Sequence, residues 1–459
     1  MEKTVVINIV GLTSSLLGEH TPFLTSWSAN KTKTLIKPIL PAVTCSVQST
    51  YLTGQLPDKH GIVGNGWYCR EECEVKFWKQ SNKLVQSDKI WEAAKKLDSS
   101  FTCANMFWWY NMYSDADYTV TPRPVYLSDG RKIPDVYSHP ANLRELLQKQ
   151  LGTFPLFNFW GPAASILSSR WIAEASKIVE QHHTPTLTLI YLPHLDYNLQ
   201  RYGPYDIRIK KDLAAIDTVC QDIISFYESK GADVVALSEY GITAVDRPIH
   251  LNRVLREHGF ITIREERGKE LLDTGASKAF AVADHQVAHV YVKDKRDIAA
   301  VRNLIESIPE VQQVMGEGEK QDQSLFHGRS GELIAVADAR SWFTYYYWVE
   351  DCKAPDFSRT VDIHRKPGYD PVELFTDPKI KQLKLLIAAK LLKKKLGLRM
   401  LMNIISLDAS LVKGSHGRIP ESVNDWPILI SKKMKTVSSS PIEAKNVFDI
   451  ILSHLTGSW

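Results

Sequence analysis

Continuous apolar runs, bounded by polar or turn-forming residues, recur along the chain at Val5 to Val10, Leu187 to Leu192 and Val234 to Leu237. Stretches of helical character accompany the later runs, at residues 168–181 and 211–230. Apolar runs of this kind are typical of parallel strands that are buried on both faces of a sheet. The pattern therefore predicts an α/β sandwich with a largely parallel central sheet flanked by helices.

Polar residues follow each apolar run at the point where the strand should end. Thr13 comes after the first run, His194 and Asp196 come after the second, and Glu239 and Tyr240 come after the third. In open α/β sheets, ligands bind at the carboxyl ends of the strands. We therefore predict that these side chains lie near one another at one edge of the sheet.

The pattern changes between about residues 264 and 330. A strand-like stretch at 287–292 precedes a helix-like stretch at 296–307. We predict that this part forms a small α+β subdomain. It would be inserted into one catalytic domain that spans residues 1–459, a length that leaves room for such an insertion.

Two further patterns leave alternatives open. Basic and apolar residues alternate from Lys379 to Arg399, which suits a helix lying on an anionic surface. An ordinary solvent-exposed helix has a similar composition, and we favour that interpretation. The aromatic clusters at 107–110 and 342–348 could stack on a flat ring of a substrate, but such clusters more often form core.

Charge and cysteine content narrow the class of protein only slightly. The 56 basic and 52 acidic side chains give a net charge of +4, too even a balance to indicate a nucleic-acid or membrane partner. The six cysteines lack the density of a disulfide scaffold. The N-terminal apolar run is too short for a signal peptide or a membrane span. We therefore expect a soluble cytoplasmic protein, and the sequence does not indicate its oligomeric state.

The most specific motif lies between residues 41 and 68, where Thr44 precedes Thr53-Gly54-Gln55-Leu56-Pro57, His60-Gly61-Ile62 and Asn65. This order resembles the nucleophile region of the nucleotide pyrophosphatase/phosphodiesterase (type I phosphodiesterase) family of the alkaline phosphatase superfamily. The resemblance implies that Thr44 is the nucleophile and that the Asn65 amide contacts a non-bridging phosphoryl oxygen.

The chemistry of the two side chains agrees with this resemblance. A threonine hydroxyl is a weak nucleophile near neutral pH and needs a metal or a base to remove its proton. An amide N–H at Asn65 would stabilise charge that develops in the transition state. The alternative is that Thr44 only caps the helix that follows it.

The resemblance also implies two divalent cations, whose carboxylate and imidazole ligands suit zinc. The chain keeps Asp196 and His416 but has Gln200 where the family has a histidine. Glu239-Tyr240 stands in place of an Asp-His pair, and Val10-Gly11 stands where the first aspartate is expected. The sequence therefore predicts either one ion or a rebuilt set of ligands, and not a standard two-zinc centre.

Histidines close to the motif positions could complete a rebuilt site for zinc or another divalent metal. The predicted ligands are Asp196, Glu239, His416, His194, His250 and His364. Each of the last three could instead be a hydrogen-bonded structural residue. His194 would face the same way as Asp196 if that stretch is extended. Asp284 and His285 also form an Asp-His pair, but they fall inside the insertion, and we expect them at the surface.

Together these features predict a metal-dependent hydrolase or transferase of phosphate or phosphonate esters, most similar to a phosphodiesterase or nucleotide pyrophosphatase. The alternative is a catalytically degenerate relative that binds a phosphorylated or aromatic metabolite, or a partner protein. Retention of both Thr44 and Asn65 favours the enzyme, whereas loss of the first aspartate favours the binding protein.

Overall fold

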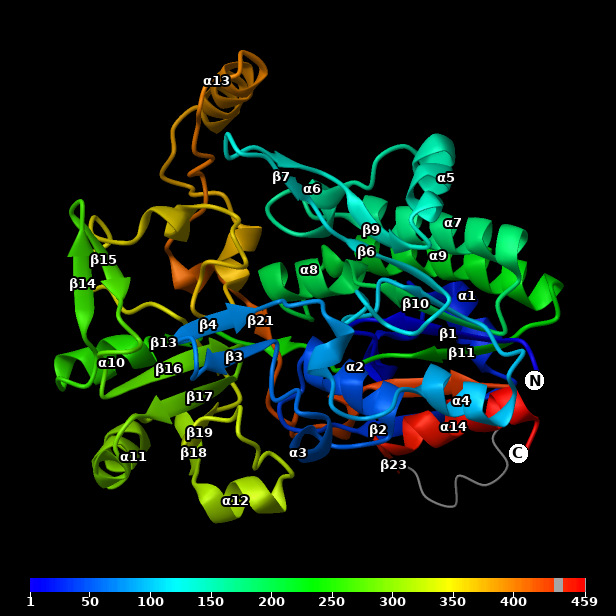
Figure 1. The fold of residues 1–459 in the computed structure, drawn as a ribbon, viewed down its shortest axis with the longest axis horizontal. Coiled ribbons are helices and arrows are strands. Elements are labelled where there is room, and N and C mark those ends of the chain that lie inside the picture. The colour runs from blue at the N-terminus through cyan, green and yellow to red at the C-terminus, as the bar shows by residue number, and fades with distance from the viewer. Residues whose placement is uncertain (433–440, 459) are drawn as a thin grey trace.

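The computed structural model describes residues 1–432 and 441–458. Within these ranges the main feature is a nine-stranded sheet with the strand order β23-β2-β22-β11-β1-β10-β5-β6-β9 (Figure 1). In this order the strands are Ile442–Glu443, Thr32–Lys37, Ile428–Ser431, Asp233–Leu237, Thr4–Ile9, Leu187–Leu192, Cys103–Met106, Tyr118–Pro122 and Val136–His139.

The centre of this sheet is parallel. Strands β11, β1, β10, β5 and β6 all run in the same direction, and antiparallel strands β22 and β9 flank them. Every residue of β1 and β10 is buried, which is the reason for their nearly continuous apolar sequences. The predicted α/β sandwich with a largely parallel sheet is thus confirmed.

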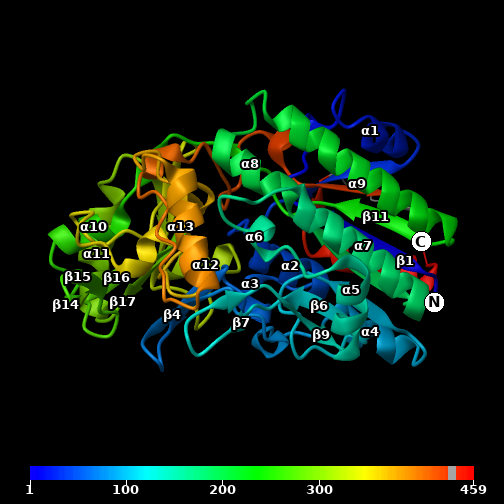
Figure 2. The same cartoon turned by 90° about the horizontal axis from the view of Figure 1, so that it is seen from above.

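Helices cover both faces of the sheet. Helices α7 (Ile166–His183) and α9 (Ile209–Ser229) run side by side on one face (Figure 2). Helices α2 (Thr44–Thr53), α4 (Ile90–Leu97) and α14 (Asn446–Thr456) pack together on the other (Figure 1). The predicted helical stretches at 168–181 and 211–230 correspond to α7 and α9.

A second sheet has four strands in the order β16-β17-β19-β18. The strands are Ala279–Asp284, Val287–Val292, Leu333–Ala337 and Val311–Met315, and the sheet is accompanied by α11 (Ile298–Glu306) and α12 (Glu317–Asp322). Strand β17 has the bounds predicted from sequence. The division of the chain near residues 264 and 330 stays a prediction.

Shorter elements lie outside these two sheets. They include α1 (Pro22–Ser28), α3 (Pro57–His60), β3 (Gly66–Cys69), β4 (Glu74–Phe77), β7 (Val125–Tyr126), β8 (Lys132–Ile133), α5 (Asn142–Leu151), α6 (Leu156–Phe159), α8 (His194–Tyr202), β12 (Thr243–Ala244), β13 (Arg247–Ile249), α10 (Leu251–Glu257), β14 (Ile263–Glu266), β15 (Lys269–Leu272), β20 (Ser341–Phe343) and β21 (Gly414–Ser415).

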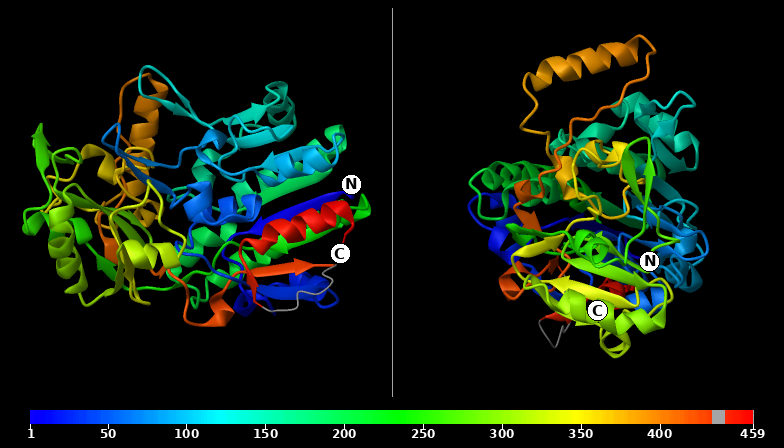
Figure 3. Two further views of the ribbon diagram at one scale, coloured as in Figure 1. Left: turned by 60° about the horizontal axis from the view of Figure 1, so that its bottom comes forward. Right: turned by 90° about the vertical axis from the view of Figure 1, so that its left-hand side faces the viewer.

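Helix α13 (Leu383–Lys395) projects from the rest of the molecule (Figures 1 and 3). None of its residues is buried. Among the residues that the structure describes, no helix has both the length and the apolar character needed to cross a membrane.

At Gly414, strand β21 packs closely against helix α8. A Cβ atom built at Gly414 would lie 2.1 Å from the carbonyl oxygen of Leu199, a distance that requires the backbone to shift. We expect Gly414→Ala to lower the free energy of unfolding by about 1–3 kcal/mol, measured by urea denaturation. The control is Gly318→Ala, because a Cβ there meets nothing within 4 Å. The control should be neutral or slightly stabilising, and equal losses in both variants would contradict the prediction.

Candidate functional site

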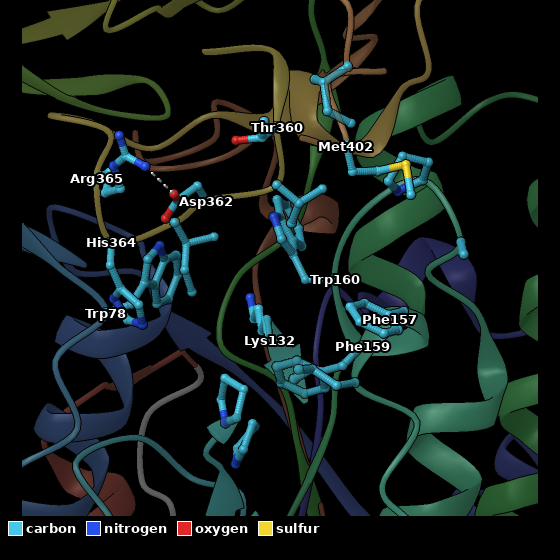
Figure 4. Close-up of a pocket in the computed structure, with 18 of the residues that line it drawn as sticks. Trp78, Lys132, Phe157, Phe159, Trp160, Thr360, Asp362, His364, Arg365 and Met402 are labelled. Carbon is cyan, nitrogen blue, oxygen red and sulfur yellow. Dashed lines mark ion pairs between the residues drawn. The ribbon is translucent and has the colours of Figure 1, made fainter. Parts of the chain in front are cut away.

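A cavity of about 1230 Å³ opens between the main sheet and the segments that follow β20. Its walls are largely aromatic and aliphatic, and Figure 4 shows Trp78, Phe157, Phe159 and Trp160 around it. Its polar lining residues include Thr44, Asp196, Tyr240, His285 and His416. The predicted gathering of polar residues after β10 and β11 is therefore confirmed for Asp196 and Tyr240.

Thr44 is the first residue of α2 and lines the cavity, with only 4% of its surface exposed. Its Oγ1 lies 3.0 Å from the Tyr240 hydroxyl. Val43 holds the N-cap position, so the alternative that Thr44 is only a helix cap is wrong. The start of a helix carries a partial positive charge, which favours anions beside Thr44.

Tyr240 connects Thr44 to Asp196. Its hydroxyl donates a hydrogen bond to Asp196 Oδ1 at 3.3 Å, and Gln200 Nε2 donates to Oδ2 at 2.7 Å. Burial raises the pKa of Asp196 to about 7, although both hydrogen bonds act in the opposite direction. The Tyr240 ring stacks on His416, with ring centroids 3.6 Å apart and planes 7° from parallel.

Glu239 is buried behind this group and is bonded by two amides. Asn8 Nδ2 donates to its Oε1 at 2.5 Å, and Gln48 Nε2 donates to the same atom. Burial raises the pKa of Glu239 to about 8, and the bonds from Gln48 and Asn8 partly offset this rise. Neither amide is predicted from the sequence pattern. Gln48 lies one helical turn after Thr44, and Asn8 is the one polar residue in the first apolar run, so each had a recognisable signal.

Asn65 is engaged in structural hydrogen bonds. Its Oδ1 accepts from the Cys45 amide at 3.0 Å, and its Nδ2 donates to Asp284 Oδ1 at 3.0 Å. Its backbone N–H donates to Asp284 Oδ2 at 2.7 Å. Asn65 is buried and is not among the residues that line the cavity. It therefore ties the start of α2 to the end of β16, and its contact with a phosphoryl oxygen stays a prediction.

The expectation that Asp284 and His285 lie at the surface is wrong. Both are buried, and His285 lines the cavity. The His285 ring lies 3.6 Å from that of His416 and 3.8 Å from that of Tyr369, between centroids. His285 has a φ of 61°, in the tight turn between β16 and β17. This turn packs against the segment after β21 and not against solvent, because the Gln286 amide donates to the carbonyl of His416.

Three predicted ligands lie apart from Asp196 and His416. His194 Nε2 lies 3.1 Å from Asp212 Oδ1. The prediction that His194 faces the same way as Asp196 is wrong, because this stretch forms helix α8, in which positions two apart point in different directions. His250 Nδ1 lies 2.8 Å from Thr344 Oγ1. His364 lies on the cavity wall, with Nδ1 3.3 Å from the carbonyl of Phe77 (Figure 4).

The residues present do not fit the metal centre that the family pattern implies. His416 Nδ1 lies 2.7 Å from the Ala42 carbonyl, and its Nε2 lies 3.9 Å from Asp196 Oδ1. Among the described residues, no three His, Cys, Asp or Glu side chains are placed to hold a metal ion. Zinc dependence therefore stays a prediction.

The two aromatic clusters differ in their relation to the cavity. Phe107, Trp108 and Tyr110 belong to the core, whereas Trp109 also lines the cavity. The aromatic residues between 342 and 348 are all buried, which confirms that they form core. Of these two clusters, only Trp109 is therefore available to contact a bound molecule.

Comparison with known proteins places the chain in a family. The model of the type I phosphodiesterase/nucleotide pyrophosphatase family matches residues 4–370. No curated protein matches the sequence with significance.

Solved structures resemble the fold over nearly the whole chain. Murine ectonucleotide pyrophosphatase/phosphodiesterase 5, as an inactive variant in complex with AMP, has a TM-score of 0.59 and 13% identity over 99% of this chain and 95% of its own. Phosphonoacetate hydrolase from Sinorhizobium meliloti, in complex with phosphonoformate, has a TM-score of 0.61 and 12% identity over 99% and 96%. At these identities the likeness shows the fold alone.

The buried carboxyl of Asp284 should make stability depend on pH. Burial raises its pKa from 3.8 to about 7, against the two bonds from Asn65. At a pH between the unfolded pKa of 3.8 and the folded pKa of about 7, the folded state binds more protons than the unfolded state. Ionisation of Asp284 therefore destabilises the fold as pH rises. We expect wild type to lose stability relative to Asp284→Asn between about pH 4 and pH 7, by about 1.4 kcal/mol per unit of pKa difference.

Urea denaturation of both proteins across this range measures the effect. The histidines are common to both proteins, so their titration cancels in the difference to first order. A difference in unfolding free energy that stays constant with pH would refute the assignment.

Proposed function

Because the chain belongs to the type I phosphodiesterase/nucleotide pyrophosphatase family, we propose that it is a hydrolase or transferase of phosphate or phosphonate esters with Thr44 as nucleophile. The observation that carries this proposal is the position of Thr44. It lies at the start of α2, in the cavity, and within hydrogen-bond distance of a tyrosine that is itself bonded to a carboxylate.

The contacts define a route for the proton of Thr44. Since the Tyr240 hydroxyl donates to Asp196, its oxygen can accept the hydroxyl hydrogen of Thr44. As Thr44 Oγ1 forms a bond to phosphorus, its proton passes to Tyr240 and the Tyr240 proton passes to Asp196. The bond from phosphorus to the leaving alcohol breaks, and that alcohol takes up the proton from Asp196. Water, or an acceptor alcohol, then attacks phosphorus and gives a proton to Asp196, while the bond from phosphorus to Thr44 Oγ1 breaks and Thr44 recovers its proton through Tyr240.

Two features of the cavity indicate the kind of ester. The positive end of α2 lies where negative charge develops on the phosphoryl group. The aromatic and aliphatic walls above it suit a large apolar substituent. The structural neighbours that bind AMP and phosphonoformate support a phosphorylated or phosphonate ligand in this fold.

A second candidate function is binding of such an ester without turnover. It is favoured by Val10, which stands where the family pattern has an aspartate, and by the lack of an assembled set of metal ligands among the described residues. In this case Thr44 would serve only as a hydrogen-bonding group.

Substitution of Thr44 separates the two functions. We expect Thr44→Ala to lower kcat for 4-nitrophenyl diesters of phosphate or phosphonate by about 1000-fold or more, because no nucleophile remains. Thr44→Ser keeps the hydroxyl and should retain measurable turnover. Undiminished activity of Thr44→Ala would refute the covalent mechanism. Wild type that binds phenylphosphonate by calorimetry but turns over no ester would establish the second candidate.

Removal of the Tyr240 hydroxyl tests the proton route. Tyr240→Phe keeps the ring that stacks on His416 but removes the atom between Thr44 and Asp196. We expect kcat to fall by about 100-fold or more with little change in KM. The control is Tyr197→Phe, because Tyr197 also lines the cavity but its hydroxyl lies 3.5 Å from Ser168. Equal effects of the two substitutions would contradict the route.

A further inference from the structure

The most strongly basic segment of the chain is also rich in leucine. Residues 379–402 contain eight basic side chains and no acidic one. The chain as a whole carries +4, so the remaining residues carry 4 − 8 = −4. The basic residues are Lys379, Lys381, Lys384, Lys390, Lys393, Lys394, Lys395 and Arg399. Positive charge is thus concentrated in one projecting part of the molecule (Figure 3).

One face of α13 is held by the rest of the protein. Leu383, Leu386 and Ile387 pack against a core cluster, and Ile387 also lines the cavity. Lys390 Nζ donates to the Leu401 carbonyl at 2.5 Å and to Asn403 Oδ1 at 2.6 Å. These contacts fix which side of the helix faces outward.

The outward face carries an apolar stripe. Leu385, Ala389, Leu392 and Leu396 recur at the spacing of one helix face. The three leucines are 65%, 57% and 66% exposed, respectively. Leucines so exposed are unfavourable in water, and a contiguous apolar stripe on a surface indicates an interaction site.

Lysines border this stripe on both sides. On a helical projection of 100° per residue, Lys393 lies on one side of the stripe and Lys384 and Lys395 lie on the other. Long lysine side chains can lie along an apolar surface and place their charge at its polar edge. Nucleic acid would pair with the lysines but would leave the leucines without a partner, whereas a bilayer with anionic headgroups suits both.

We infer that α13 docks the protein on an anionic membrane surface. The helix has 13 residues, a length of about 20 Å, which is too short to span a bilayer but suits a helix that lies in its interface. Helix α6 and the β7–β8 hairpin, which carry exposed apolar side chains, lie on the same side of the molecule as α13 (Figure 1). These side chains are Phe157, Val125, Tyr126 and Ile133.

Docking in this orientation would bring the cavity opening to the lipid. The segment that carries the outward stripe also contributes Leu391, Lys394 and Leu398 to the cavity wall. Phe157 and Tyr126 line the same cavity and are exposed at its rim. If the proposed function holds, the substrate is a phosphoester with a long apolar chain, which could enter from the membrane. The docking itself does not depend on that function.

Vesicle sedimentation of the full chain tests the inference. We expect binding to vesicles of phosphatidylcholine with about one part in four of phosphatidylserine, weakening with added salt, and at least tenfold weaker binding to phosphatidylcholine alone. The double substitution Leu385→Ser with Leu392→Ser should weaken binding at least tenfold. The control is Leu97→Ser, which changes a leucine that is 63% exposed on α4. Lys393→Ser with Lys395→Ser should remove the preference for phosphatidylserine.

Further measurements keep this test independent of the catalytic proposal. Neither leucine lines the cavity, so turnover of a soluble nitrophenyl ester should be unchanged in the leucine double variant. Thr44→Ala should bind vesicles as wild type does, whatever its activity. Equal binding to the two kinds of vesicle, or binding that the leucine changes do not affect, would overturn the inference. A self-association in solution that the leucine changes abolish would also overturn it, because the stripe would then contact a second copy of the chain.

Discussion

The buried hydroxyl of Tyr240 is the contact on which the geometry of the candidate site depends. A buried polar group left without a hydrogen bond costs about 1–3 kcal/mol, so this hydroxyl must stay between Thr44 and Asp196. The ring that carries it is fixed by stacking on His416. One side chain thereby sets the relative positions of α2, α8 and the residues after β21.

The departures from the family pattern are consistent with one another. A buried carboxylate must be paired or hydrogen-bonded. Gln200, which stands where the family pattern has a histidine, donates to Asp196. Asn8 and Gln48 donate to Glu239. Neutral amides therefore donate to both carboxyls, and burial keeps the pKa of both above its usual value. The network is not closed, because Glu239 Oε2 and Asn8 Oδ1 are buried and have no hydrogen-bond partner among the described residues.

The parallel strands could be predicted from sequence because strands buried on both faces must be apolar throughout. The positions of Asp196 and Tyr240 followed from the same reasoning, since polar residues after such strands meet at one edge of the sheet. His194 could not be placed, because helix α8 starts directly after β10 and rotates it away from Asp196. Asp284 could not be recognised either. Its partner Asn65 is 219 residues away, in the segment between α3 and β3, and only the tertiary fold brings the two together.

The packing of the fold does not explain why the outward face of α13 is apolar. The inner face of α13 packs against a core cluster and lines the cavity. These contacts require apolar residues on the inner face but not on the outward face. Leu385 and Leu392 are exposed and are not among the residues that pack there, so packing alone does not require leucine at either position. An apolar phase with anionic groups that covers exposed leucines between lysines lowers their free energy. The outward face of α13 lies beside the cavity opening. The surface that binds the lipid would therefore also be the surface through which an apolar ester reaches Thr44.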